Sequence, residues 1–306
     1  MTTLLIKVLS ALLLDRLLGE PVKWHPLKGF GRWAQWIEAL ARHSNRKVAS
    51  GTIAWMLSVL SWVGLAFALK AIHPAIGWSV DIAPLYFALG GRSLDDHAKA
   101  VVVALKNNDL ERAQRKTARM VSRETQRLDA SGVARATTES VLENGNDAVF
   151  ATLFWFCLLG GPGALLFRLA NTLDAMWGYR TPRYLHFGRA AAFIDDVLGW
   201  LPARLTALTY ALLGNTRNAL RCWRQQAPHW DSPNAGPVMT SGAGALSVEL
   251  GGSAIYHGIE ESRPRIGNGY APDVHTIERA LCLVRIGTLL WLSIMMLGIV
   301  IQALVT

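Results

Sequence analysis

Three carboxylates stand four residues apart in the stretch ATTESVLENGNDAVFATLFWF, residues 136–156. If this segment is helical, Glu139, Glu143 and Asp147 share one face, because residues four apart lie one above the other on a helix. Three stacked carboxylates repel one another unless a cation binds them, and magnesium held by carboxylates and nucleotide phosphates would remove that repulsion. A solvated amphipathic face is the alternative. An all-acidic face that runs into an apolar segment favours the magnesium site.

Two further motifs carry groups suited to proton transfer and anion binding. The stretch DRLLGEPVKWHP, residues 15–26, contains Asp15, Glu20 and His25. A histidine exchanges protons near neutral pH, although a lone histidine is more often structural. The stretch SRETQRLD, residues 122–129, places Arg123 and Glu124 ahead of the acidic stretch. Taken alone, the histidine motif is a weak signal of function, and Arg123 and Glu124 are candidates together with the acidic stretch that follows.

Arginines, amides and further acids follow in three stretches: NTLDAMWGYRTPRYLHFGR (171–189), FIDDVLGWLPAR (193–204) and HWDSPNAGPVMTSGAGALSVELGG (229–252). Arginine forks suit phosphate and carboxylate oxygens, although tyrosine and arginine also anchor helices at a membrane surface. Ser-Pro-Asn-Ala-Gly is typical of a turn, and the glycines after it let backbone N–H groups approach an anion. The Walker A pattern is missing, and a plain loop is the alternative. The candidate residues are Asn171, Asp174, Tyr179, Arg180, Arg183, Tyr184, Arg189, Asp195, Asp196, Arg204, Ser232 and Asn234.

The composition is that of a membrane protein. Hydrophobic residues make up 51% of the 306 residues, charged residues 17%, and there are 12 tryptophans. This profile is typical of several helices in lipid with indole rings at the interfaces. The net charge of +9 lies in polar stretches between apolar ones, as in cytoplasmic loops, and not in the single stripe of a nucleic-acid binder. The three cysteines, Cys157, Cys222 and Cys282, are far apart and predict neither a disulfide framework nor a zinc site.

The apolar segments that must position these motifs predict an all-α integral membrane protein with about four transmembrane helices. The expected spans are residues 2–18, taken as an uncleaved helix, 52–69, the weaker 71–91, and 282–305. Two further apolar segments are interrupted and expected to be re-entrant or interfacial, namely 148–169 by Gly160-Gly161-Pro162-Gly163 and 197–213 by Pro202 and Arg204. This topology keeps the polar motifs on the cytoplasmic side.

The chain is predicted to be one membrane-embedded catalytic domain, 1–306. Residues 92–147 form a cytoplasmic helical insert in it, and residues 215–280 form a cytoplasmic loop region. Within the insert, Asn107-Asn108-Asp109 supplies a turn and a helix N-cap.

Taken together, the motifs resemble one family. LLGEPVKWHP, ESVLENGNDAVFATLF, GGPGALLFRLANTLDAMWGY, RYLHFGRAAAFIDDV, PARLTAL and SPNAG, within residues 12–255, are similar to the adenosylcobinamide-phosphate synthases (CbiB/CobD) of cobalamin biosynthesis. The resemblance implies an inner-membrane enzyme that uses ATP and magnesium to join adenosylcobyric acid, through an amide, to (R)-1-amino-2-propanol phosphate or ethanolamine phosphate. The resemblance implies three partners: the corrinoid, the amino-alcohol phosphate and the lipid bilayer. It implies no nucleic-acid partner, and it leaves open whether the protein is a homo-oligomer.

On that hypothesis the matching residues take three roles. Metal binding falls to Glu139, Glu143, Asp147, Asp195 and Asp196. Substrate and phosphate binding falls to Arg123, Asn144, Asn171, Tyr179, Arg183, Tyr184, Arg204, Ser232 and Asn234. The catalytic candidates are His25, Glu124 and Asp174.

The chain also departs from the family pattern. Glu124 and Glu20 stand where an aspartate is usual, and Phe193 and Met239 replace a usual arginine and glutamate. Two rival functions stay open: a non-catalytic membrane signalling relative resembling AmpE, and a membrane transporter with Asp81 and Arg204 as intramembrane charges.

Overall fold

The computed structural model describes residues 2–21, 25–42, 46–256 and 258–305, and most of these are helical. The predicted mainly α-helical architecture is confirmed. The chain divides into two compact units, unit 1 with residues 1–90, 147–199 and 298–306, and unit 2 with residues 91–146 and 200–297. Both predicted inserts therefore fall largely in unit 2. The prediction of one catalytic domain stays a prediction.

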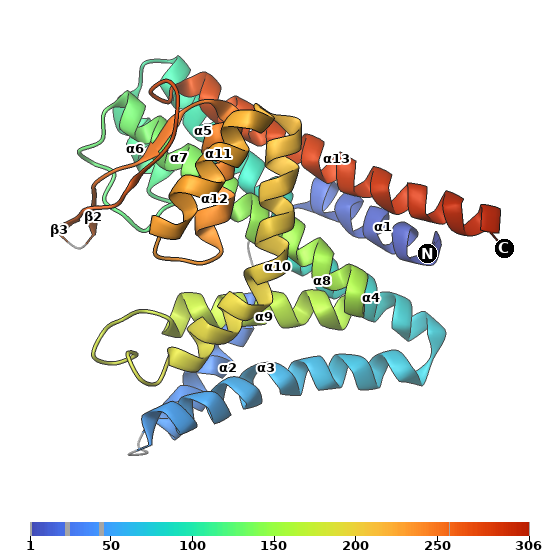
Figure 1. Cartoon of the computed structure of the whole chain (residues 1–306). Coiled ribbons are helices and arrows are strands. Elements are labelled where there is room, and N and C mark those ends of the chain that lie inside the picture. Colours follow the sequence, from blue (N-terminus) through green and yellow to red (C-terminus); the bar gives the residue numbers. More distant parts are fainter. Residues whose placement is uncertain (1, 22–24, 43–45, 257, 306) are drawn as a thin grey trace. The chain divides into compact units, whose positions relative to one another are not determined.

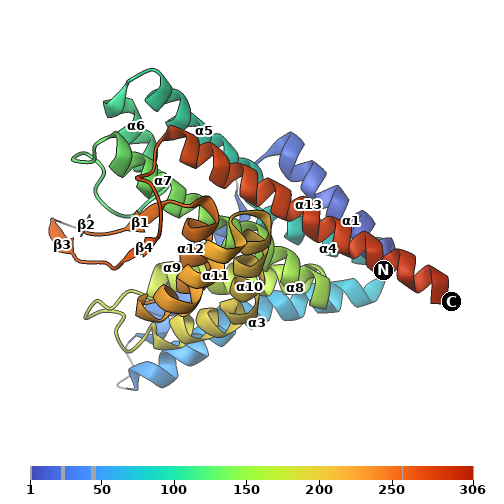
Figure 2. The same ribbon diagram turned by 45° about the horizontal axis from the view of Figure 1, so that its top comes forward.

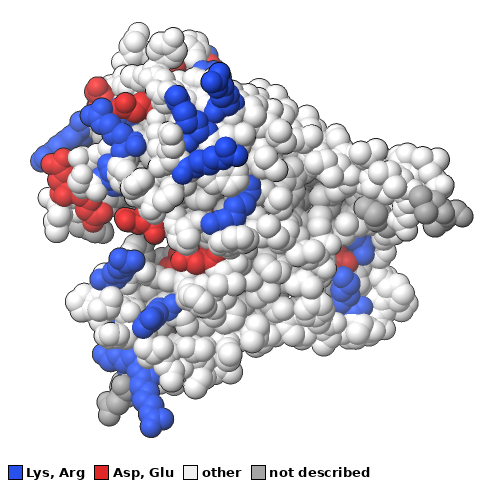
Figure 3. Space-filling view, in the orientation of Figure 1, with Lys and Arg blue, Asp and Glu red and all other residues white. Residues whose placement is uncertain are grey.

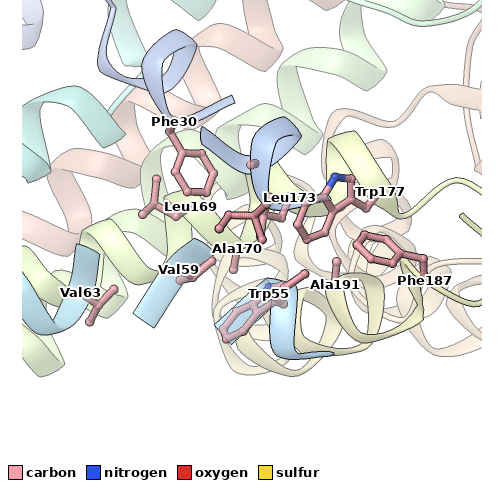
Figure 4. Close-up of a cluster of buried hydrophobic side chains, with 13 residues drawn as sticks. Phe30, Trp55, Val59, Val63, Leu169, Ala170, Leu173, Trp177, Phe187 and Ala191 are labelled. Atoms are coloured by element: carbon pink, nitrogen blue, oxygen red, sulfur yellow. The ribbon is translucent and has the colours of Figure 1, made fainter. Parts of the chain in front are cut away.

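Unit 1 is built from helices that enclose one apolar core. They are α1 (Thr2–Leu18), α2 (Pro26–Ala41), α3 (Lys47–Ile72), α4 (Pro74–Ala88), the π-helical turn η1 (Asn146–Phe150, from residue 147 on), α8 (Ala151–Leu159), α9 (Gly161–Trp177) and the first part of α10 (Arg189–Leu213). Figure 4 shows the core between α2, α3 and α9, where Phe30 faces Leu169 and Trp177 packs edge to face on Phe187 at 5.1 Å.

The Gly-Gly-Pro-Gly stretch ends one helix and starts the next, as predicted. Gly160 has a φ of +70°, which favours glycine, and it separates α8 from α9. The N–H of Gly161 donates to Asp81 Oδ1 at 2.8 Å. The same carboxylate accepts from Lys7 Nζ at 2.7 Å and from Lys70 Nζ at 2.8 Å. Asp81 is 2% exposed, so its charge is balanced inside the helix packing.

Unit 2 surrounds the largely buried helix α7 (Ala130–Gly145) with α5 (Gly91–Lys106), α6 (Leu110–Thr117), the rest of α10, α11 (Thr216–Gln226), the 3-10 turn η2 (Ala227–His229), α12 (Ala235–Leu246) and most of α13 (Val274–Val305). Asp109 is the N-cap of α6, as predicted, and its side chain accepts from the N–H of Arg112 at 2.9 Å.

Four short strands in unit 2 depart from the all-α prediction. β1 (Glu249–Gly251) pairs antiparallel with β4 (Arg265–Gly267), and β2 (Ala254–Tyr256) pairs antiparallel with β3 (Ile259–Glu261), as Figures 1 and 2 show. Three residues are too few for an alternating pattern to be visible in the sequence. Figure 3 shows charged side chains gathered around these strands and none over the C-terminal part of α13.

Two helices in the described residues are long and apolar enough to cross a membrane, α3 and residues 274–304 of α13. With 17 and 15 residues, α1 and α4 extend about 26 and 22 Å at 1.5 Å per residue, less than a hydrocarbon core of about 30 Å. The predicted count of four spans is therefore not confirmed. Helix α10 runs through Pro202 without a break and is not among the two.

Candidate functional site

A cavity of about 370 Å³ in unit 2 gathers several of the predicted residues. Helix α7 contributes Glu139, Glu143 and Asn144, and the segment before it contributes Arg123. Arg263, between β3 and β4, lines the same cavity, and its guanidinium lies 5.7 Å from the ring centroid of Trp230. Two arginines, an amide and aromatic groups therefore meet in one pocket with the carboxylates of Glu139, Glu143, Asp231 and Glu261.

The carboxylate of Glu139 is fully paired in this pocket. It is 3% exposed and accepts from Arg123 Nη2 and, at 3.1 Å, from Arg263 Nη2. Its other oxygen accepts from the N–H of Gly251 at 2.7 Å. Two guanidinium groups and one backbone N–H therefore balance the charge of this carboxylate and hold it in place. The structure gives Glu139 the role of positioning the two arginines.

The other predicted residues of unit 2 lie in loops and at helix ends. Glu124 accepts from the N–H of Gly258 at 2.7 Å. Asn144 donates to the Ser140 carbonyl within α7 at 2.9 Å.

The Ser-Pro-Asn motif forms the predicted turn, and helix α12 follows it directly, so the first glycines after the turn are helical. Ser232 Oγ accepts from the N–H of Ala235 at 3.1 Å. Asn234 Oδ1 accepts from Arg204 at 3.3 Å, and the Arg204 guanidinium lies 4.3 Å from the ring centroid of Trp200. Arg204 is therefore held next to this turn.

Unit 1 holds a second cluster, of four aspartates that act on one another electrostatically. Burial, with Asp196 and Asp147 nearby, raises the pKa of Asp174 to about 6. Burial, with the other three aspartates, raises the pKa of Asp195 to about 8, opposed only by a hydrogen bond from Asn171. Asp195 Oδ1 is buried and has no hydrogen-bond partner among the described residues. Asp195 therefore holds a proton at neutral pH, and the cluster favours positive charge.

His25 lies in the same unit as the aspartates. It is the N-cap of α2, and its Nδ1 accepts from the N–H of Leu27 at 3.2 Å. Burial lowers the pKa of its imidazole, against the opposing effect of Glu20. Arg168 on α9 is close enough to act electrostatically on His25, and it interacts in turn with Glu20 and Asp147. A neutral imidazole, an arginine and carboxylates thus interact within one unit. Residues 22–24 of the motif that predicts His25 lie outside the described part of the chain.

The tyrosine and arginine loop between α9 and α10 is tied to α2. Arg183 donates to Glu38 Oε1 from Nε at 3.0 Å and from Nη2 at 2.7 Å. Tyr184 donates to the other oxygen of Glu38 at 3.4 Å. Glu38 is 2% exposed, whereas Tyr179 is 56% exposed. The structure thus gives Arg183 and Tyr184 a loop-anchoring contact, and their predicted role in substrate binding stays a prediction.

The predicted magnesium ligands belong to both units. Glu139 and Glu143 belong to α7 in unit 2, whereas Asp147 lies in the π-helical turn η1 and interacts with the aspartates of unit 1. A π-helical turn changes the angle between successive side chains, so a spacing of four no longer marks one face. Among the described residues no group of three or more His, Cys, Asp or Glu side chains is positioned to hold a metal ion. The metal roles of Glu139, Glu143, Asp147, Asp195 and Asp196 stay predictions.

Three residues of these sites are absent from the sequence-based list: Glu38, Arg168 and Arg263. Glu38 and Arg263 lie outside the quoted motifs, and their partners are 145 and 124 residues away along the chain. Arg168 lies inside a quoted motif, GGPGALLFRLANTLDAMWGY, where an arginine in an apolar helix was the available signal.

Comparison with known proteins identifies the family. The family model described as CobD/Cbib protein matches residues 8–284. A protein of Stutzerimonas stutzeri named Cobalamin biosynthesis protein CobD is 57% identical over 96% of this chain and 97% of its own length. Proteins of the same name from Chromobacterium violaceum and Mycobacterium tuberculosis are 55% and 37% identical over 93% and 92% of this chain, and over 93% and 91% of their own lengths. No solved structure matches.

These matches confirm the resemblance that the motifs indicate. Because the family model and the relatives each cover most of the sequence, the chain belongs to the CobD/Cbib protein family.

Proposed function

We propose that this protein is an ATP-dependent ligase of cobalamin biosynthesis. It joins adenosylcobyric acid to (R)-1-amino-2-propanol phosphate or ethanolamine phosphate, giving adenosylcobinamide phosphate. Family membership and the names of the relatives support the pathway. The two apolar helices of spanning length support a multi-pass protein of the bacterial inner membrane, with its polar sites on the cytoplasmic side.

The observation that carries the proposal is the cluster of buried carboxylates in unit 1. Asp195 has an unpartnered buried oxygen, and the pKa of both Asp174 and Asp195 is raised by burial and like charge. Carboxylate oxygens are the donors that magnesium prefers, so these residues fit a magnesium–nucleotide complex. One or two of the predicted ligands Asp147, Asp195 and Asp196 would hold the ion together with phosphate oxygens of the nucleotide, because no three acids among the described residues are positioned to hold it alone. The ion, when bound, would neutralise charge on the nucleotide phosphates. Asn171 fixes the orientation of Asp195 through its hydrogen bond.

Amide formation needs an activated carboxyl group, because a carboxylate in water does not react with an amine. ATP supplies the activation when a carboxylate oxygen attacks the γ-phosphorus and ADP leaves. The amine nitrogen then attacks the acyl carbon, phosphate leaves, and the amine loses a proton. His25 is suited to take up that proton, because burial lowers its pKa and keeps the imidazole neutral.

The pocket of unit 2 is proposed to bind the phosphate group of a substrate. Arg123 and Arg263 are held by Glu139 with N–H groups still available, because a guanidinium carries five donors. Asn144 and Trp230 also line the pocket. Phosphate oxygens accept well from such paired arginines.

Single-turnover amide formation by the purified protein in detergent tests the proposal. Adenosylcobyric acid, aminopropanol phosphate, ATP and magnesium are supplied, and the assay is repeated with ethanolamine phosphate. We expect product from the wild type and at least about a hundredfold slower formation by Asp174→Asn, a change of about 2.7 kcal/mol in barrier height. Asp96→Asn, an exposed aspartate of unit 2, is the control and should match the wild type.

Absence of product with either amino-alcohol phosphate, from folded wild-type protein, would contradict the ligase and favour the non-catalytic signalling relative. The transporter has less support from the geometry. Asp81, one of its two intramembrane charges, is paired with Lys7 and Lys70 and bonded to a backbone N–H.

A further inference from the structure

An apolar pocket of about 530 Å³ lies within unit 1, among α2, α3, α4 and α9. Phe30, Trp62, Phe87 and Leu165 supply most of its aromatic and aliphatic wall. This volume falls within the range of about 300–1,000 Å³ that is typical of small-molecule sites. The pocket is therefore large enough to take a bulky apolar group.

One charged residue lines this pocket in the described part of the chain. It is Arg168 of α9, and its Nε is buried without a hydrogen-bond partner. Glu20 and Asp147 act on Arg168 electrostatically, but neither accepts from this Nε. An unpaired buried N–H is costly, because its bond to water is lost and not replaced. An anionic oxygen of a ligand would supply the missing acceptor.

His25, the proposed proton acceptor, lies beside the same pocket. His25 directly precedes Pro26, which lines the pocket, and the His25 ring lies 6.3 Å from the ring of Phe87 between centroids. Asp147 acts on Arg168 and on the aspartate cluster alike. An anionic group paired with Arg168 would therefore lie against the apolar wall and within electrostatic reach of His25 and Asp147.

We propose that this pocket binds the acid substrate, with Arg168 pairing its carboxylate and the apolar wall holding the adjoining edge of its macrocycle. The inference rests on the proposed function and adds to it the site of one substrate. Of the three substrates, only the corrinoid acid combines a carboxylate with a large, partly apolar body, whereas ATP and the amino-alcohol phosphate are strongly polar. Charge and apolarity together therefore select the corrinoid.

Equilibrium dialysis without ATP or amine tests the inference, because the visible absorbance of the corrinoid reports binding directly. Adenosylcobyric acid is compared with its derivative in which the reacting carboxyl is a primary amide. For the wild type we expect the acid to bind about tenfold to a hundredfold more tightly than the amide, as for a charge-assisted pair. Arg168→Gln should bring that ratio close to one, and Arg168→Lys should keep part of it.

Two further variants separate the charge from the apolar wall. Phe87→Ala should weaken the binding of acid and amide equally, leaving their ratio unchanged. Arg32→Gln, an exposed arginine of α2, should behave as the wild type. The ratio of two ligands does not depend on the folded fraction of a preparation. If Arg168→Gln does not fold, unchanged binding by Phe87→Ala still overturns the inference.

The outcomes distinguish this inference from the proposed function. If the wild type forms the amide and Arg168→Gln still binds the acid more tightly than the amide, this inference about the pocket is wrong and the proposed ligase activity is retained. If the protein retains phosphatidylglycerol only when Arg168 is present, and corrinoid binding does not depend on Arg168, the pocket binds a lipid. That outcome also contradicts the inference. A folded wild type that neither binds nor converts the corrinoid contradicts the ligase, and the inference fails with it.

Discussion

The buried carboxylates of the two units differ in how their charge is balanced. In unit 2, Glu139 is 3% exposed and is held by Arg123, Arg263 and a backbone N–H. In unit 1, Asp195 lies among three other aspartates, has one unpartnered oxygen, and has its pKa raised to about 8. A buried carboxyl group is thus an ion-paired structural anion in unit 2, whereas in unit 1 it has a raised pKa and is a candidate cation ligand. The charge state of a buried carboxyl group therefore depends on the charged and hydrogen-bonding groups around it, and the residue type alone does not set it.

Removing a partner of Glu139 should give the largest loss of stability. Arg123→Met leaves a buried carboxylate with one arginine fewer, and we expect the free energy of unfolding to fall by about 3 kcal/mol. Thermal unfolding in detergent measures it. Arg265→Gln, which removes an exposed pair with Glu249, is the matched control and should cost less than about 1 kcal/mol. Equal losses in the two variants would contradict a structural role for the buried pair.

Neutralising Asp195 should raise the free energy of unfolding, in contrast to Arg123→Met, and the gain should depend on pH. Its pKa is about 8 when folded, against an ordinary value of 3.8. Between these values the folded state binds more protons than the unfolded state, so wild-type stability falls as pH rises towards 8. Asp195→Asn removes that loss. We expect its free energy of unfolding to exceed that of the wild type by about 1 to 3 kcal/mol at pH 8.5 and by less at pH 5. The measurement is the unfolding midpoint across this range without metal, and Asp96→Asn should leave the wild-type slope unchanged.

Magnesium binding should distinguish the carboxylates of the two units, with a smaller effect on stability than the substitutions above. A ligand at ten times its dissociation constant stabilises by about 1.4 kcal/mol. We expect magnesium with an ATP analogue to raise the unfolding midpoint of the wild type more at pH 8 than at pH 6, because protons compete for Asp174 and Asp195. Asp195→Asn should abolish the shift. If Glu143→Gln abolishes it and Asp195→Asn does not, the metal site lies on α7, as the spacing of the acids predicts.

Local features of the fold were predictable because their causes are local. The glycine and proline stretch that separates α8 from α9 and the cap at Asp109 follow from the backbone preferences of single residues. The short strands of unit 2 were missed, because their pairing joins residues such as Glu249 and Gly267 through contacts that leave no periodic pattern. The motifs likewise identified the family, since their order along the chain is a property of the sequence alone.

The candidate sites show where sequence reasoning ends. The sequence determined that acids, arginines and one histidine stand beside apolar segments, and it named several residues of the two sites. Only the tertiary structure decided that Glu139 pairs with Arg263, that Asp147 joins Asp174 and Asp195, and that Arg168 faces an apolar pocket. The physical reason is that the charge state and partners of a buried group depend on which distant side chains and how much water surround it, and folding fixes both.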